Sequence, residues 1–339
     1  GLGGLCYGLK AAGFDIVGAS EINEGFRNIY AENFPEVTPL ASDIRTFTEA
    51  DCVSLREREG EIDLMAGGPP CQGFSLAGKR NPADVRNTLF YDYLNVANTV
   101  RPKIVLMENV RLLTSMKDEN GHLVSDNILE AFSDIGYDAR FFSLNAKDYG
   151  VPQHRERVIF IATRKGLGKS PAAPLASHGK NLDLFGNTKP YRTFGDAVSD
   201  LQFVESGERS KDDCWHFAVS HPEHVIEWLV DVPEGHSAHD NTDPTLRPPS
   251  GYNTTYKRQT WNQPGATVST TFSMISGCRN VHPIATRSLT IREALRLQSF
   301  PDSFALQGKT GDIRVAIGNA VPPLFGYELS THIMRNYIL

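Results

Sequence analysis

The sequence predicts an α/β protein, a sheet with helices on both faces, into which a smaller, irregular, mainly β domain is inserted. Residues 1–164 alternate short apolar segments with amphipathic ones, the pattern of parallel strands joined by helices. From residue 165 the chain becomes rich in glycine, proline and polar residues, and regular periodicity resumes only at about residue 288. We therefore expect a large domain made of 1–164 and 288–339, and a small domain at 165–287.

Composition narrows the function classes. The chain has 339 residues, of which 40% are hydrophobic and 22% charged, and these values exclude a disordered or fibrous chain. It has no run of eighteen apolar residues, so no membrane contact is expected. The net charge of −6 gives no general signal for nucleic-acid binding, which must be argued from motifs. Five scattered cysteines without a CxxC pair favour a reducing, cytoplasmic compartment.

The first motif is a glycine cluster before a predicted helix at 5–12. Gly3 and Gly4 would let backbone N–H groups approach a ligand at the start of that helix. A strand predicted at 16–19 leads to Glu21, seventeen residues beyond Gly4, near the spacing at which an acid accepts the ribose hydroxyls of a nucleoside cofactor. The alternative is an ordinary turn at the start of a helix.

A second predicted strand, 62–66, leads into the segment Gly-Gly-Pro-Pro-Cys-Gln-Gly-Phe-Ser at 67–75. Cys71 therefore follows the carboxyl end of a strand, where α/β enzymes bind their ligands. The prolines restrict the backbone and the glycines permit close approach of a large group. A lone cysteine is usually an inert buried residue, but this setting favours a nucleophile.

A third predicted strand, 104–107, ends in Glu108-Asn109-Val110. Since neighbouring parallel strands end at the same edge of a sheet, we expect a thiol and a carboxylate to lie together there. This pair suits covalent attack on an electron-poor ring, with the acid protonating a ring nitrogen. Taken alone, Glu108 would more often be a salt-bridge or cap residue.

A fourth motif, Gln-His-Arg-Glu-Arg at 153–157, precedes a predicted strand at 158–162. Alternate residues of a strand share one face, so Arg155 and Arg157 would present two guanidinium groups to a phosphate or a carbonyl oxygen. The alternative is a strand edge covered with solvated charge.

Two capping boxes predict helix starts later in the chain. Thr290 and Glu293 predict a helix that continues to 298, and Ser220 and Glu223 predict another in the small domain. The second box makes a zinc site the less favoured interpretation of the nearby cysteine and histidines, and no metal is expected. The residues of that alternative are Cys214, His216, His221 and His224.

Together these motifs resemble the cytosine-C5 DNA methyltransferases. The family's order continues with Arg-Glu-x-x-x-Leu-Gln-x-Phe-Pro at 292–301 and Gly-Asn-Ala-Val-Pro-Pro at 318–323. The resemblance covers the chain on both sides of residues 165–285. It implies a Rossmann-like, S-adenosylmethionine-dependent methyltransferase sheet, with the C-terminal helix returning beside the cofactor and the inserted domain recognising the target.

The resemblance also implies the catalytic roles. Cys71 would add to C6 of a cytosine flipped out of the duplex, because C6 is inaccessible inside the base stack. Glu108 would hold N3 and the exocyclic amine, Arg157 would contact O2, and Arg155 would brace the catalytic loop.

For the cofactor, the resemblance points to residues along the whole large domain. They are Gly3, Gly4, Glu21, Ile22, Asp43, Ile44, Pro69, Leu89, Asn319 and Val321. In the family a strand ending in Asp-Leu-Phe precedes the glycine loop, and this sequence lacks that strand. We therefore expect the natural protein to have upstream residues that form it.

The implied partner is double-stranded DNA, and no obligate protein partner is expected, so the protein could act as a monomer. In the family the variable region reads the DNA sequence, and Thr267-Val268 resembles a dipeptide of those regions. For each residue of this region, the alternative to a DNA contact is a position on the polar surface of a sheet. The candidate DNA contacts are Gln72, Ser75, Asn109, Lys257, Arg258 and Thr267.

The expected function is that of a sequence-specific DNA methyltransferase of a bacterium or phage, of the restriction-modification or orphan type. Three other functions are considered as alternatives. The tRNA-directed branch of the family carries a Cys-Phe-Thr tripeptide that this sequence lacks. A non-catalytic DNA-binding regulator would not need Cys71, Glu108 and Arg157. A dehydrogenase is excluded by the Pro-Cys and Glu-Asn-Val motifs.

Overall fold

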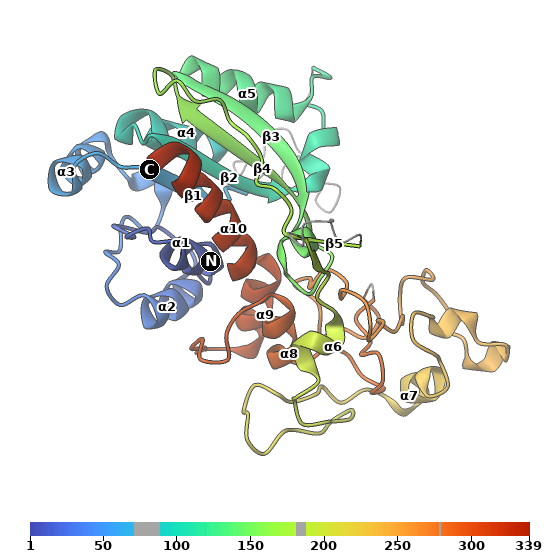
Figure 1. Ribbon diagram of the computed structural model, residues 1–339. Helices are drawn as coiled ribbons and strands as arrows, with labels where there is room; N and C mark the ends of the chain where they lie inside the picture. Colours follow the sequence, from blue (N-terminus) through green and yellow to red (C-terminus); the bar gives the residue numbers. More distant parts are fainter. Residues whose placement is uncertain (71–88, 119, 181–187, 278) are drawn as a thin grey trace.

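The computed structural model describes residues 1–70, 89–118, 120–180, 188–277 and 279–339, and its centre is a four-stranded sheet (Figure 1). The strand order is β1 (Leu64–Gly67), β2 (Ile104–Val110), β4 (Glu156–Arg164), β3 (Tyr137–Asn145). β1 and β2 are parallel, whereas β4 is antiparallel to both of its neighbours. The predicted α/β class is confirmed, and the sheet is mixed rather than wholly parallel.

Helices cover both faces of this sheet because β2 is apolar on both sides. Ile104 and Leu106 belong to a core cluster with α10 (Pro323–Ile333), on one face. Val105 and Met107 point to the opposite face, as successive strand residues must, and pack in a second cluster with α4 (Leu89–Val100) and α5 (Val124–Asp134) (Figure 1). A continuous apolar run is typical of a strand buried on both faces.

The strand predicted at 16–19 is not formed. This segment lies between α1 (Gly4–Ala11) and α2 (Glu24–Asn33), and its pairing in the described chain is a single parallel bridge between Ala19 and Pro39. A strand needs a neighbouring backbone to satisfy its N–H and C=O groups, and among the described strands β1 pairs only with β2. The apolar pattern thus identified an extended segment but not its partner.

The first helix matches the prediction at 5–12 and packs directly against α10. A Cβ atom at Gly8 would overlap the backbone of Gly326 and Tyr327, and one at Gly4 would overlap the carbonyl oxygen of Val321. Glycine is therefore required at both positions for the two helices to approach this closely. The contact holds the N-terminal glycine cluster against the C-terminal return of the chain.

The segment 165–287 is irregular. Its described strands are β5 (His178–Gly179) and β6 (Lys189–Pro190), so it contains less β structure than expected, and its helices are α6 (Phe194–Val198) and α7 (Glu223–Leu229). The capping box predicted at Ser220 is wrong, since α7 begins after Pro222 and no side chain caps it. The box of Thr290 and Glu293 is present at the start of α8 (Ile291–Leu297).

The remaining elements connect these layers. They are α3 (Glu49–Glu59), α9 (Thr310–Asn319), the π-helical turn Met334–Ile338, and the 3₁₀ turns Ile44–Thr46, Arg111–Ser115, Ala146–Tyr149, Ala238–Asp240 and Pro244–Leu246. None of the helices in the described part of the chain is long and apolar enough to cross a membrane.

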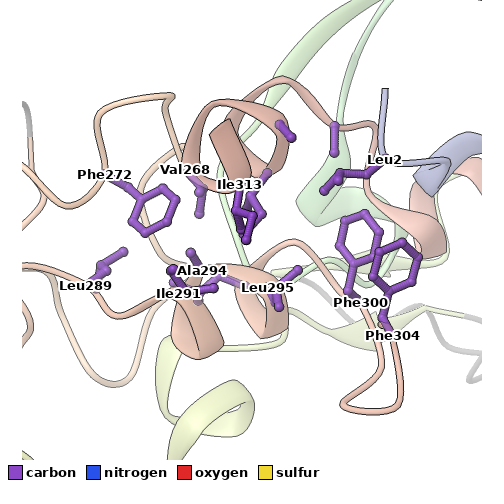
Figure 2. Close-up of a cluster of buried hydrophobic side chains, with 14 of the residues drawn as sticks. Leu2, Val268, Phe272, Leu289, Ile291, Ala294, Leu295, Phe300, Phe304 and Ile313 are labelled. Atoms are coloured by element: carbon purple, nitrogen blue, oxygen red, sulfur yellow. The ribbon is translucent and has the colours of Figure 1, made fainter. Parts of the chain in front are cut away.

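One core cluster combines residues from all three predicted segments. Val268 and Phe272 of the inserted segment pack with Ile291, Leu295 and other residues of the C-terminal return (Figure 2). Leu2 joins the same cluster from the N-terminal segment. The inserted segment therefore shares a hydrophobic core with the rest of the chain, while its boundaries at 165 and 287 stay a prediction.

A buried ionic cluster secures the start of α8. The Arg287 guanidinium donates two hydrogen bonds, of 2.8 and 2.7 Å, to the Glu293 carboxylate. Burial alone would raise the pKa of Glu293, but the charge and hydrogen bonds of Arg287 outweigh it and lower the pKa to about 2. Burial lowers the pKa of the adjacent His282 to about 4, although Glu293 opposes the shift.

We predict that Gly8→Ala lowers the free energy of unfolding by about 1–3 kcal/mol, because the new methyl group overlaps the α10 backbone. Alanine itself favours a helix over glycine by up to about 1 kcal/mol, so the loss is a net one. The matched control is Gly311→Ala in α9, where nothing lies within 4 Å of an added Cβ. Urea unfolding measures both variants, and an equal effect at the two sites would contradict the close helix contact.

A second prediction concerns acid. A folded-state pKa of about 4 for His282, below the ordinary 6.5, means that its stabilising contribution is complete above pH 6.5 and is lost as the pH falls towards 4. One such group changes the free energy of unfolding by at most about 1.4 kcal/mol per pH unit. The slope measured between pH 6.5 and 4 should become shallower in His282→Gln and stay unchanged in the exposed-site control His236→Gln.

Candidate active site

The carboxyl ends of β1 and β2 bring the Pro-Cys segment next to a carboxylate. In the parallel register Gly67 lies opposite Met107, so the turn that follows β1 passes beside Glu108. A Cβ atom at Gly68 would lie 3.1 Å from Glu108 Oε2. Cys71, Gln72 and Ser75 lie outside the described residues, so the thiol–carboxylate pair stays a prediction, but the chain enters that segment beside the carboxylate.

Glu108 is paired with Arg157. Arg157 Nε lies 2.7 Å from Glu108 Oε1, and each side chain is only 14% exposed. The antiparallel register sets Glu108 opposite Ile159, so residues 157 and 159 share a face with it and the ion pair follows from the strand pairing. The result is a fixed carboxylate and a fixed guanidinium at one edge of the sheet.

Arg155 does not present its charge beside Arg157, which corrects the expectation of two exposed guanidinium groups. It is fully buried, and it donates to the carbonyls of Val268, Gly318 and Ala320 at 3.1, 2.9 and 2.8 Å. Burial lowers the pKa of Arg155 well below its usual value. Its structural role is to join the sheet to the inserted segment and to the end of α9.

Gln153 was not among the predicted site residues. It is fully buried, its Oε1 accepts from the Val268 amide at 2.9 Å, and its Nε2 donates to the Leu297 carbonyl at 2.8 Å. The available signal was its alternation with Arg155 and Arg157 in the motif at 153–157.

Two predicted DNA contacts are buried among protein partners. Asn109 is buried, and its Nδ2 donates to the carbonyl of Pro69 at 3.0 Å, so it ties the turn after β1 to β2. Arg258 is 3% exposed because its guanidinium is enclosed by acceptors within the inserted segment. These acceptors are the carbonyls of Leu229, His282, Ile284 and Ala285 and the Thr286 hydroxyl.

Two other candidate DNA contacts, Thr267 and Lys257, remain accessible. Thr267 is exposed, and its Oγ1 donates to the His154 carbonyl at 2.5 Å. Lys257 is half-buried. Both roles stay predictions.

The predicted cofactor residues fall on segments that the fold brings side by side. Gly3 has a left-handed backbone (φ 91°) at the N-terminus of α1, where a Cβ would overlap the rings of Phe34 and Tyr30. Val321 covers Gly4 from the C-terminal return. The Ala19–Pro39 bridge, together with a hydrogen bond from Ser20 Oγ to the Ala41 carbonyl, places the segment that leads to Glu21 next to the one that leads to Asp43.

The individual cofactor-side groups range from half-buried to exposed. Glu21 Oε1 accepts from the Asn23 amide at 2.8 Å, and Ile22 is 63% exposed. Hydrogen bonds from Arg45 lower the pKa of Asp43. Ile44 packs against the core cluster formed by β2, α4 and α5. Leu89 is the first residue of α4, and Asn319 is the last residue of α9. The Pro69 carbonyl accepts a hydrogen bond from Asn109.

The histidines of the zinc alternative have protein partners. His216 Nδ1 lies 3.0 Å from Thr290 Oγ1, and its Nε2 lies 2.7 Å from the Gln202 carbonyl. His221 Nε2 contacts Ser288. Among the described residues no group of three or more His, Cys, Asp or Glu side chains could hold a metal ion.

A cavity of about 570 Å³ lies elsewhere, between α1, α8 and α10. Tyr7, Arg296 and Tyr327 line it, together with neighbouring residues, but none of the predicted catalytic or cofactor residues does. It is therefore separate from the sheet edge described above.

Comparison with known proteins places this geometry in a family. The family model described as C-5 cytosine-specific DNA methylase matches residues 1–335. The Type II methyltransferase M.DdeI of Desulfomicrobium norvegicum is 31% identical, over 98% of this chain and 86% of its own. M1.HphI of Haemophilus parahaemolyticus is 33% identical, over 99% and 85%.

Solved structures share the fold. A protein of an Escherichia coli prophage, described as a DNA modification methyltransferase, superposes with a TM-score of 0.75 at 23% identity, over 99% of this chain and 97% of its own. A DNMT2 mutant of Spodoptera frugiperda superposes with a TM-score of 0.64 at 17% identity, over 100% and 97%.

Arg155→Lys should lower the free energy of unfolding by about 2–4 kcal/mol, because one ammonium group cannot reach three carbonyls and leaves buried acceptors without donors. Arg157→Lys keeps a positive charge beside Glu108, so it should cost less, about 1 kcal/mol. Urea unfolding of the two variants compares these costs. A larger loss at Arg157 than at Arg155 would contradict the assignment of Arg155 as the structural tie.

Proposed function

The chain belongs to the C-5 cytosine-specific DNA methylase family and is a DNA (cytosine-5-)-methyltransferase, and we propose that it is a Type II modification enzyme that reads a specific site in duplex DNA. The proposal rests on its Type II relatives, which match nearly the whole chain. The target cytosine would leave the base stack to reach the sheet edge, because a ring carbon inside a duplex is inaccessible to a side chain.

The observation that best supports this function is the fixed Glu108–Arg157 pair beside the turn that leads to Cys71. In the proposed reaction the Cys71 thiolate forms a bond to C6 of the cytosine. Glu108 assists protonation of N3, and the electron pair of the C5–C6 double bond becomes available at C5. Arg157 contacts O2 and keeps Glu108 oriented. After C5 is methylated, a base removes the C5 proton, the double bond forms again and the C6–sulfur bond breaks.

Bound S-adenosylmethionine would supply the electrophilic methyl group. The residues present fit it, since no side chain caps the N-terminus of α1, and the glycines there let backbone N–H groups approach a ligand closely. Glu21 would accept the ribose hydroxyls, with Ile22 beside it, and Asp43 and Ile44 would bind the adenine. Pro69, Leu89, Asn319 and Val321 would complete the site.

DNA binding is proposed for the accessible candidates, Thr267 and Lys257, together with Gln72 and Ser75. Incubation of mixed-sequence duplex DNA with the protein and S-adenosylmethionine, followed by bisulfite sequencing, tests the function. The expected result is methylation of cytosines within one recurring sequence. Methylation of tRNA but not of DNA would overturn the proposal.

We predict that Cys71→Ala abolishes methyl transfer and leaves duplex binding largely intact, because the thiol supplies chemistry but little contact area. Duplex DNA that contains 5-fluorocytosine should trap the wild-type enzyme as a denaturation-resistant adduct, since fluorine prevents the final proton removal. The matched control is Cys214→Ala, which removes an exposed free cysteine and should form the adduct normally. Full-rate methylation by Cys71→Ala would refute the covalent mechanism.

A further inference from the structure

The residues just before β4 and the inserted segment are joined by a continuous set of hydrogen bonds. The Gly265 amide donates to the Pro152 carbonyl and the His154 amide to the Gly265 carbonyl, at 2.9 and 2.7 Å. Thr267 Oγ1 donates to the His154 carbonyl. At the next residue, Val268, side chains hold both backbone groups: Gln153 accepts from its amide, and Arg155 donates to its carbonyl.

Behind Val268 a second buried amide extends this contact to the cofactor side. Gln153 Nε2 lies 2.8 Å from Gln298 Oε1, and Gln298 Nε2 donates to the Ile317 carbonyl at 2.6 Å. Both glutamines are fully buried. Ile317 lies two residues before Asn319, so one chain of amides runs from the inserted segment to the predicted cofactor site.

Only one orientation of the Gln153 amide satisfies its surroundings. Its nitrogen faces two acceptors, the Leu297 carbonyl and Gln298 Oε1, while its oxygen faces one donor, the Val268 amide. A rotated amide would set acceptor against acceptor. The side chain therefore fixes the register of residue 268 against the strand, which a nonspecific apolar contact would not do.

We propose that Gln153, supported by Gln298, is a positioning residue that makes methyl transfer depend on correct reading of the DNA. The proposal rests on the proposed function. Thr267 is exposed beside the clamped Val268, and Arg157 of the Glu108–Arg157 pair lies four residues after Gln153, at the start of β4. A duplex that fits the inserted segment keeps this register, and a mismatched duplex that displaces Thr267 also displaces Arg157 and the carboxylate.

The test uses the full chain and the site identified by bisulfite sequencing, in duplexes with the correct sequence or one altered base pair. In Gln153→Met the ratio of kcat/KM between the two duplexes should fall about tenfold, mainly through a lower kcat on the correct site. The KM for S-adenosylmethionine should change less than about twofold. Gln298→Met, at the other end of the amide pair, should lower the same ratio and provides a second variant if the first does not fold.

The matched control is Asn280→Leu. Asn280 is also buried, and its Nδ2 donates to the carbonyls of Thr271 and Met274, so it stabilises the inserted segment without contacting β4. If Gln153 only stabilised the fold, Gln153→Met, Gln298→Met and Asn280→Leu would show the same ratio of kcat/KM between the two duplexes when their losses of stability are equal. An unchanged ratio in both glutamine variants, or an equal fall in Asn280→Leu, would overturn the inference. Absence of methylation by the wild type would instead refute the proposed function.

Discussion

Arg155 is the buried charge on which the arrangement of the molecule depends. An arginine without a carboxylate partner is costly to bury, and this one is compensated by three carbonyls from two distant parts of the chain. Those carbonyls belong to the inserted segment and to the end of α9. Because the guanidinium is planar and its donors diverge, it holds these segments at fixed distances from the sheet. Arg157 lies two residues further on, so the position of its ion pair with Glu108 is fixed as well.

This constraint explains why the inserted segment needs so little regular structure. Some of its backbone groups bond to buried side chains, as the four carbonyls around Arg258 do, and others bond to one another in turns and loops rather than in a sheet ladder. The shared core of Val268, Phe272 and Leu295 supplies the apolar contribution (Figure 2). Loops held in this way can vary in sequence while the anchors stay constant, which suits a surface that reads DNA.

Local patterns predicted much of the fold, and distant contacts explain what they missed. Apolar runs identified β2 and β4, and Thr290 with Glu293 identified the start of α8, because these signals lie within a few residues. Sequence reasoning predicted that Arg258 contacts DNA, because nothing near it in the sequence reveals the carbonyls that enclose it. Gln153 belongs to a recognised motif but was assigned no role, because its hydrogen-bond partners lie more than 100 positions away in the sequence. The extended segment at 16–19 shows that strand pairing depends on a neighbour that the segment's own residues do not encode.

The glycine contact between α1 and α10 has a consequence for protein synthesis. Gly4 and Gly8 lie against Val321 and Gly326, which are more than 300 positions later in the chain. Helix α1 can therefore reach its final place only after the chain as far as Gly326 has left the ribosome. A nascent or prematurely terminated chain has the N-terminal glycine cluster but not the surface that holds it.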